Sequence, residues 1–185
     1  MPKSGEWVSY YIYSGKERMD LKLAIVGEKR LGEKDLMWFE IVTRTGELDF
    51  ILKRLIEGDP LNPKKVYRQI VKIVNKNRSD YSPAIEIPAG DSNKADETLK
   101  SFPCLEDLGE KKLYKHNKKE FNAYIIKNDT PRQSLIVYSK EIPFFGIIKM
   151  ESENVKIELI DLGNNATSEI TEEPLKIIDT NEENE

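Results

Sequence analysis

The sequence predicts a mainly β protein of the α+β class. We expect a curled antiparallel sheet or incomplete β-barrel of about nine strands, covered by one or two helices. Alternating apolar and polar residues recur in short stretches separated by turn signals, which is typical of antiparallel strands. The apolar residues of 63–76 follow helical spacing instead. At 185 residues the chain is long enough for one domain with a substantial core.

The opening stretch, residues 5–27, reads as two amphipathic strands joined at Ser14-Gly15-Lys16. Side chains of a strand alternate between its two faces, so residues two apart share a face. The sets that share a face are Trp7, Ser9, Tyr11 and Tyr13 in the first strand and Met19, Leu21, Leu23 and Ile25 in the second. A sheet with such an apolar, aromatic face needs something to cover it.

Residues 34–43 alternate with apolar side chains on both faces, which predicts a third, well-covered strand. Residues 48–56 fit strand and helix about equally well. We favour a strand there, because a short turn at Thr45-Gly46-Glu47 that returns into an apolar run is a hairpin pattern.

The stretch from Gly58 to Pro63 interrupts that element. Asn62 followed by Pro63 is a good helix start, with an N-cap residue and a proline at the first helical position. Residues 63–76 are therefore predicted to form a helix of three to four turns, whose apolar stripe covers the sheet.

Residues 89–107 are polar and predict a long loop. Strand patterns resume after it, separated by turns at residues 117–119 and 128–131. The predicted strands cover residues 108–116, 121–127, 133–140, 144–152 and 155–162.

The net charge of −4 is unevenly distributed. Residues 171–185 carry a net −5, which leaves the rest of the chain at +1, so we expect a single domain over 1–170 and a disordered acidic tail over 171–185. The nearly neutral body argues against nucleic acid as a partner. The longest apolar runs, such as Ile142 to Ile148, are far shorter than the roughly 20 residues of a membrane span, so the protein is not expected to be integral to a membrane.

No catalytic residue, metal ligand set or cofactor motif is predicted. His116 and Cys104 are the single residues of their kinds, and His116 reads as a residue beside an exposed turn. No nucleophile elbow, calcium loop, P-loop or dinucleotide fingerprint occurs. The lysine-rich stretch 111–119 reads best as a hairpin whose charges prevent edge pairing, with contact to anionic headgroups or a partner as the alternative.

Aromatic and apolar side chains are the remaining candidates for a site. They either form an ordinary sheet core or line an apolar cavity between the sheet and the predicted helix. The candidate ligand-binding residues are Trp7, Tyr11, Tyr13, Trp38, Phe50, Tyr67, Ile70, Phe144 and Phe145.

Several segments together resemble a known family. These are the start from Gly5 to Tyr10, the second strand from Lys22 to Gly27, Gly58-Asp59-Pro60, residues 85–88, residues 141–149 and residues 157–163. They resemble the lipoprotein-sorting (LolA/LolB-like) carriers of the bacterial envelope. The resemblance covers most of residues 5–163 and implies an incomplete barrel that holds acyl chains under helices. The sequence departs from the carriers in lacking a helix before the first strand and a lipid-attachment cysteine near its start.

Two functions follow as expectations. The first is a non-enzymatic, extracytoplasmic protein that holds a lipid or lipoprotein acyl chain between the concave sheet and the helix at 63–76. Its localisation is periplasmic or otherwise extracytoplasmic, with a signal segment absent from this chain, or alternatively cytoplasmic. The second is a structural or interaction module of the cell envelope that engages a protein partner and has no small-molecule ligand.

Overall fold

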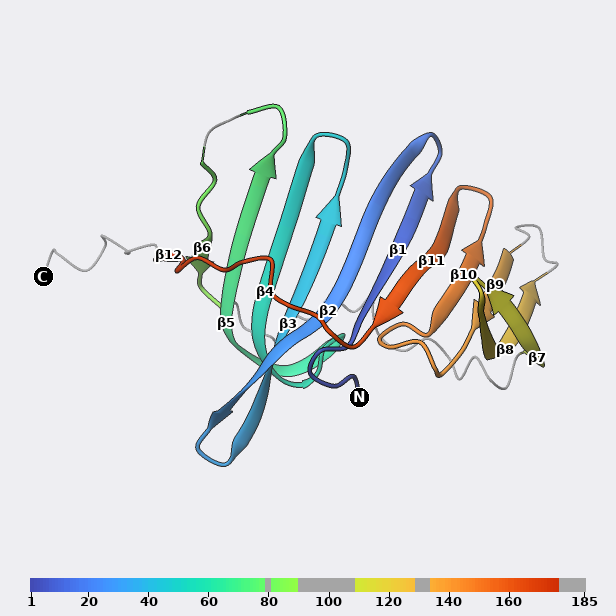
Figure 1. Ribbon diagram of the computed structural model, residues 1–185, viewed down its shortest axis with the longest axis horizontal. Coiled ribbons are helices and arrows are strands. Elements are labelled where there is room, and N and C mark those ends of the chain that lie inside the picture. The colour runs from blue at the N-terminus through green and yellow to red at the C-terminus, as the bar shows by residue number, and fades with distance from the viewer. Residues whose placement is uncertain (79–80, 90–108, 129–133, 177–185) are drawn as a thin grey trace, which may run out of the picture.

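The computed structural model describes residues 1–78, 81–89, 109–128 and 134–176. These residues form one open sheet of twelve strands and contain no helix (Figure 1). The strands are β1 (Trp7–Ser14), β2 (Glu17–Leu31), β3 (Lys34–Arg44), β4 (Leu48–Asp59), β5 (Asn62–Asn75), β6 (Ile85–Ile87), β7 (Glu110–His116), β8 (Lys119–Asn128), β9 (Ser134–Tyr138), β10 (Ile147–Glu151), β11 (Val155–Gly163) and β12 (Leu175–Lys176). Their spatial order is β12-β6-β5-β4-β3-β2-β1-β11-β10-β9-β8-β7.

Nearly all neighbours in the sheet are antiparallel, and most are joined by short hairpins. The exception is β12, which pairs in parallel with β6. β1 lies between β2 and β11, so the first strand of the chain pairs with residues 155–163 in the middle of the sheet. This one long-range pairing joins the sequence-local meander β1–β5 to the second meander β7–β11.

The main core lies on one face of the sheet, because the sheet curls around that face. Val8 and Tyr10 of β1 and Phe39 of β3 are buried in the same cluster as Phe121 of β8 and Ile148 of β10. These strands are far apart in the sheet, so their side chains meet only if the sheet bends. We call this face the inner face and the opposite one the outer face.

Two contacts hold the curl. The β7–β8 turn lies against β11, where His116 Nε2 is 2.6 Å from the carbonyl oxygen of Leu159 and Asn117 Nδ2 donates to that of Ile160 at 2.9 Å. In the segment before β10, the ring of Phe144 stacks on Phe39 with centroids 5.5 Å apart. The second meander therefore closes over one part of the inner face of the first.

The predicted fold class is wrong in two respects: the described residues form twelve strands, not about nine, and no covering helix is present. Residues 63–75 of the predicted helix lie in β5, which pairs along its whole length with β4. The signal at Asn62-Pro63 belongs to a hairpin, where Asp59 pairs with Asn62 and its carboxylate accepts a hydrogen bond from the Leu61 amide at 2.8 Å. The β-branched residues that follow, such as Val71 and Ile73, fit the surface of a strand better than a helix.

The nine predicted strands correspond to β1–β4 and β7–β11, and the ambiguous residues 48–56 lie in strand β4. Strands β6 and β12 were not predicted, since three and two residues are too short to show a periodicity. Residues 90–108 of the predicted loop and strand, including Cys104, and residues 177–185 of the predicted tail lie outside the described residues. Within the described part, no helix is long and apolar enough to cross a membrane.

Candidate functional site

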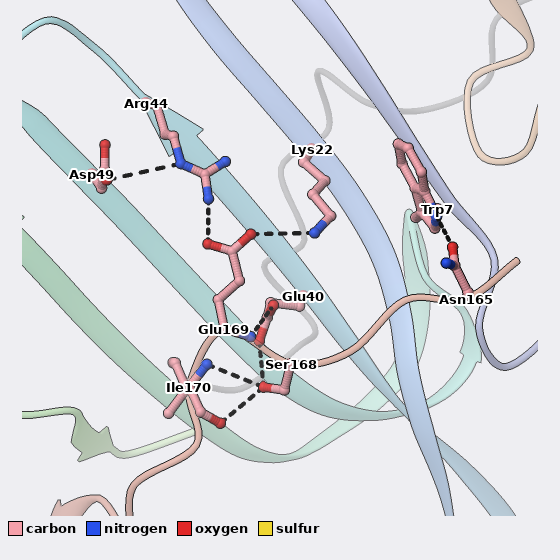
Figure 2. A network of polar contacts seen from close by, with 9 residues as sticks. All are labelled: Trp7, Lys22, Glu40, Arg44, Asp49, Asn165, Ser168, Glu169 and Ile170. Carbon is pink, nitrogen blue, oxygen red and sulfur yellow. Dashed lines mark hydrogen bonds and ion pairs between the residues drawn. The ribbon is translucent and has the colours of Figure 1, made fainter. Parts of the chain in front are cut away.

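A C-terminal strap, residues 165–173, crosses the outer face of β1–β5 and ends beside β6 (Figures 1 and 2). At its start, Trp7 Nε1 donates to Asn165 Oδ1 at 3.0 Å. Near its middle, the Glu169 carboxylate pairs with Lys22, at 3.2 Å, and with Arg44. At its end, Lys72 Nζ donates to Glu172 at 2.5 Å, and this bond lowers the pKa of Glu172.

The strap is anchored by one buried carboxylate and one buried apolar side chain. Glu40 is fully buried and accepts hydrogen bonds from Ser168 Oγ, at 2.7 Å, and from the Glu169 amide, at 3.0 Å. Ile170 lies in a second core cluster on the outer face, with Val42, Ile51, Ile70 and Ala84. The strap therefore closes a small second core and satisfies the charges around it.

A surface hollow of about 380 Å³ lies beside the strap, between Trp7, Lys22, Arg44 and Asn165. Its charged and polar groups already have partners: Lys22 and Arg44 share Glu169, and Trp7 bonds to Asn165. These mutually satisfied groups indicate a structural clasp rather than a site that selects a ligand.

The inner face is different, because its apolar surface continues beyond the part that the second meander covers. One row of cross-strand neighbours is apolar from Val8 and Leu23 in the core through Ile41 and Leu52 to Val71. The row then reaches Ile85 on β6, whose side chain is 37% exposed. The main core thus runs outward, without a polar break, onto an open surface.

The next row of the same face is also apolar at its outer end. Thr43, Phe50 and Ile73 are cross-strand neighbours on β3, β4 and β5. Phe50 is 38% and Ile73 51% exposed, although both belong to the face that is buried elsewhere. We call this open part of the inner face the trough. Its residues are Ile41, Thr43, Phe50, Leu52, Val71, Ile73 and Ile85.

The row on the other side of Ile41, Leu52 and Val71, opposite Phe50 and Ile73, is polar on β4 and β5. Arg54 and Gln69 are cross-strand neighbours in the row between Phe39 and Ile87. Arg54 Nε donates to Gln69 Oε1 at 2.6 Å, and partial burial lowers the pKa of Arg54. One end of an apolar surface therefore carries a partly buried cation.

The nine predicted ligand-binding residues do not gather in one place. Phe50 lies in the trough, whereas Phe144 and Phe145 pack against the main core. Tyr67 lies at a bulge of β5, where its hydroxyl donates to Glu57 at 2.7 Å and accepts from Lys34 at 2.9 Å. The remaining five, which lie on the outer face, are Trp7, Tyr11, Tyr13, Trp38 and Ile70.

The outer-face position of the aromatic residues follows from the burial of their neighbours in sequence. Val8 and Tyr10 are almost completely buried on the inner face, so Trp7, Tyr11 and Tyr13 face the other way. Their rings lie beneath long cationic side chains, for example Arg18 over Tyr11 at 4.6 Å. Both faces of β1 are apolar enough that alternation alone does not show which one is buried.

Sequence reasoning missed most of the trough and its cation. The helical interpretation of 63–76 places Val71 and Ile73 in a lid, and neither Ile85 nor Arg54 is among the predicted site residues. The alternation of Leu48, Phe50, Leu52 and Arg54 along residues 48–56 was the available signal for Arg54, since it places an arginine on an otherwise apolar face.

Among the described residues, no group of three or more His, Cys, Asp or Glu side chains is placed to hold a metal ion. His116 contacts the carbonyl oxygen of Leu159, and this contact helps to hold the β7–β8 turn against β11. No known protein family, curated protein or solved structure matches the chain.

Proposed function

We propose that the protein is a non-enzymatic binding protein whose trough receives an apolar chain. The observation that carries this proposal is the continuity of the trough with the main core, combined with the exposure of Phe50, Ile73 and Ile85. Contiguous exposed apolar side chains mark binding surfaces in soluble proteins, whereas scattered ones do not.

The energetics suit a flexible alkyl chain. Each methylene that leaves water contributes about 0.8 kcal/mol, without any directional contact. A row of aliphatic side chains and one phenylalanine supplies such burial and tolerates different chain lengths. Among the described residues no helix covers this site: residues 63–75, predicted to form that helix, lie in β5 and form part of its floor through Val71 and Ile73.

The test uses Nile red, an uncharged apolar dye, displaced by dodecan-1-ol. We expect the dye to bind the wild-type protein and the double variant Phe50→Ser/Ile73→Ser to bind it at least tenfold more weakly, because two exposed apolar contacts are lost. The matched control is Leu113→Ser on β7, where a leucine that is 61% exposed lies outside the trough.

Two results would contradict the proposal. The first is a wild-type protein that binds neither Nile red nor dodecan-1-ol. The second is an equal loss of affinity in Leu113→Ser and in the double variant, which would show that the dye senses any exposed apolar residue. Circular dichroism of each variant checks that the sheet is intact.

The proposal also includes an extracytoplasmic location, which rests on the resemblance to lipoprotein-sorting carriers alone. Immunodetection of the protein in periplasmic and cytoplasmic fractions tests it, and a purely cytoplasmic signal would remove that part of the proposal. Extraction of the purified protein with organic solvent, followed by mass spectrometry, would identify a lipid or an acyl chain carried from the cell.

A second candidate function is an interaction module, and the β7 edge favours it. β7 is the last strand of the sheet, and the strand to which it is paired is β8. The β7–β8 hairpin carries six lysines and two glutamates between residues 110 and 127, while Leu113 points out from the edge strand with 61% exposure. An open edge accepts an extended peptide as a further strand, and this charge favours an acidic one.

Fluorescence anisotropy with labelled peptides tests this second candidate. An acidic peptide of alternating glutamate and valine should bind the wild-type protein, and Leu113→Asp should weaken it. A peptide of alternating lysine and valine serves as the control. Equal binding of the two peptides would contradict the assignment of an acidic partner to this edge.

A further inference from the structure

The two faces of β3–β6 differ in how their charges are compensated. From Met37 to Arg44 on β3 and on the paired parts of β4, β5 and β6, the outer face carries seven charged side chains. They are held by one another or by the strap, as in the pair of Arg68 with Glu86 at 2.7 Å. These seven residues are Glu40, Arg44, Asp49, Lys53, Arg68, Lys72 and Glu86. On the outer face, each of these charges therefore has a partner of opposite charge or a hydrogen-bonding group.

Arg54 does not follow this pattern. Consider the inner face of β3 from Met37 to Thr43 and of the parts of β4, β5 and β6 that pair with it. Among the described residues there, Arg54 is the one that carries a charge. Its partner is the neutral Gln69, which accepts from Nε, and no described carboxylate forms an ion pair with the guanidinium. Both terminal amino groups of Arg54 remain without a described partner.

An uncompensated, partly buried cation is costly in a folded protein. Removing a charge from water is unfavourable unless an opposite charge or several hydrogen bonds replace the lost solvation. Burial accordingly lowers the pKa of Arg54, and no acidic group among the described residues opposes this shift. The cost has a functional explanation if the opposite charge arrives with a ligand.

We infer that the ligand of the trough is a single-chain amphiphile with an anionic head group, and that Arg54 binds that head while the alkyl tail lies along the trough. This inference rests on the proposed function and specifies its ligand. A guanidinium forms two parallel hydrogen bonds to a carboxylate or a phosphate, so either group suits the site. The bond to Gln69 holds Nε and leaves the two amino groups for the head.

The dimensions of the trough agree with this arrangement. Arg54 and Phe50 lie four residues apart on the same face of β4, a separation of roughly 13 Å along the strand. Leu52 lies between them, flanked by Ile41 and Val71 on the neighbouring strands. An alkyl chain that starts at the guanidinium would therefore meet an unbroken apolar surface toward Phe50 and Ile73.

Displacement of Nile red by three amphiphiles with the same alkyl chain tests the inference. Dodecanoate, dodecyl phosphate and uncharged dodecan-1-ol are titrated at pH 8 below their micellar concentrations, and sodium acetate serves as a head without a tail. The wild-type protein should prefer both anionic amphiphiles to the alcohol by about tenfold or more, which is what hydrogen bonds to a charged group contribute. Acetate alone should displace nothing.

Two substitutions assign the preference to Arg54. Arg54→Gln should abolish it and leave the affinity for dodecan-1-ol unchanged, whereas Arg54→Lys should retain part of it through charge alone. Arg30→Gln removes an arginine from the exposed β2–β3 hairpin and should change nothing. Retention of dodecan-1-ol binding shows that each variant is folded.

The outcomes separate this inference from the function on which it rests. Equal affinities of the wild-type protein for dodecanoate and dodecan-1-ol, or a preference that survives in Arg54→Gln, would overturn the role of Arg54 and leave the trough as an apolar site. Failure of all three amphiphiles to bind would overturn the proposed function, and the inference with it.

Discussion

Removal of the apolar anchor of the strap should destabilise the protein more than removal of its central ion pairs. Ile170 is buried in the outer-face cluster, and an isoleucine replaced by alanine in such a site costs about 3 kcal/mol in unfolding free energy. The Glu169 carboxylate remains a quarter exposed, and ion pairs of that kind contribute at most about 1 kcal/mol. Glu169→Gln also keeps the backbone amide that donates to Glu40.

Urea denaturation followed by tryptophan fluorescence measures both effects. Trp7 bonds to Asn165 of the strap, and Trp38 packs against the cluster that holds Ile170, so both tryptophans of the chain report on strap docking. We expect Ile170→Ala to lower the transition midpoint clearly and Glu169→Gln to shift it only slightly. A larger destabilisation by Glu169→Gln would refute the reasoning, because it would show that charge pairing, not apolar burial, holds the strap.

Three further predictions concern stability. Gly146→Ala should be severely destabilising, since the backbone there has φ of +69° and a Cβ would lie 2.1 Å from the ring of Tyr138; thermal melts check this against wild type. Trp38→Ala should cost about 3 kcal/mol in urea denaturation and leave dodecan-1-ol binding intact, because this ring packs on the outer face. The hydrogen bond from Arg68 lowers the pKa of Glu86 in the folded state, so its stabilising contribution is complete above the ordinary glutamate pKa and is lost as the pH falls through the lowered one. The stability difference between wild type and Glu86→Gln should therefore be constant near pH 7 and shrink in acid, and a difference that grew in acid would contradict this sign.

The local structure of most strands was accessible from sequence, and the identity of the buried face was not. Alternation at residues 7–13 shows that Trp7 and Tyr11 share a face and that Val8 and Tyr10 share the other. It does not show which face is buried, because both sets are apolar. Only the curl of the sheet, which brings Phe121 of β8 onto the side of Tyr10, selects the inner face.

Residues 63–76 illustrate the same limit for helix and strand. Val66, Ile70, Val71, Ile73 and Val74 satisfy a helical stripe and also populate both faces of a strand. Pairing with β4 decides in favour of the strand, since hydrogen bonds to a neighbouring strand depend on a partner outside the segment. Residues 171–173 show that a distant partner can also order a segment whose composition predicts disorder. Their acidic sequence predicts a solvated tail, but in the folded protein Lys72 pairs with Glu172.

The sequence by itself determined the β character of the chain, most of its hairpins and the nearly neutral charge of residues 1–170, because these depend on neighbouring residues and on composition. The tertiary structure decided the order of the strands, the face that is buried, the strap across the outer face and the isolation of Arg54 on the inner one. These features depend on contacts between residues that are distant in the chain. That Arg54 lacks an ion-pair partner among the described residues can be recognised only when the positions of the neighbouring carboxylates are known.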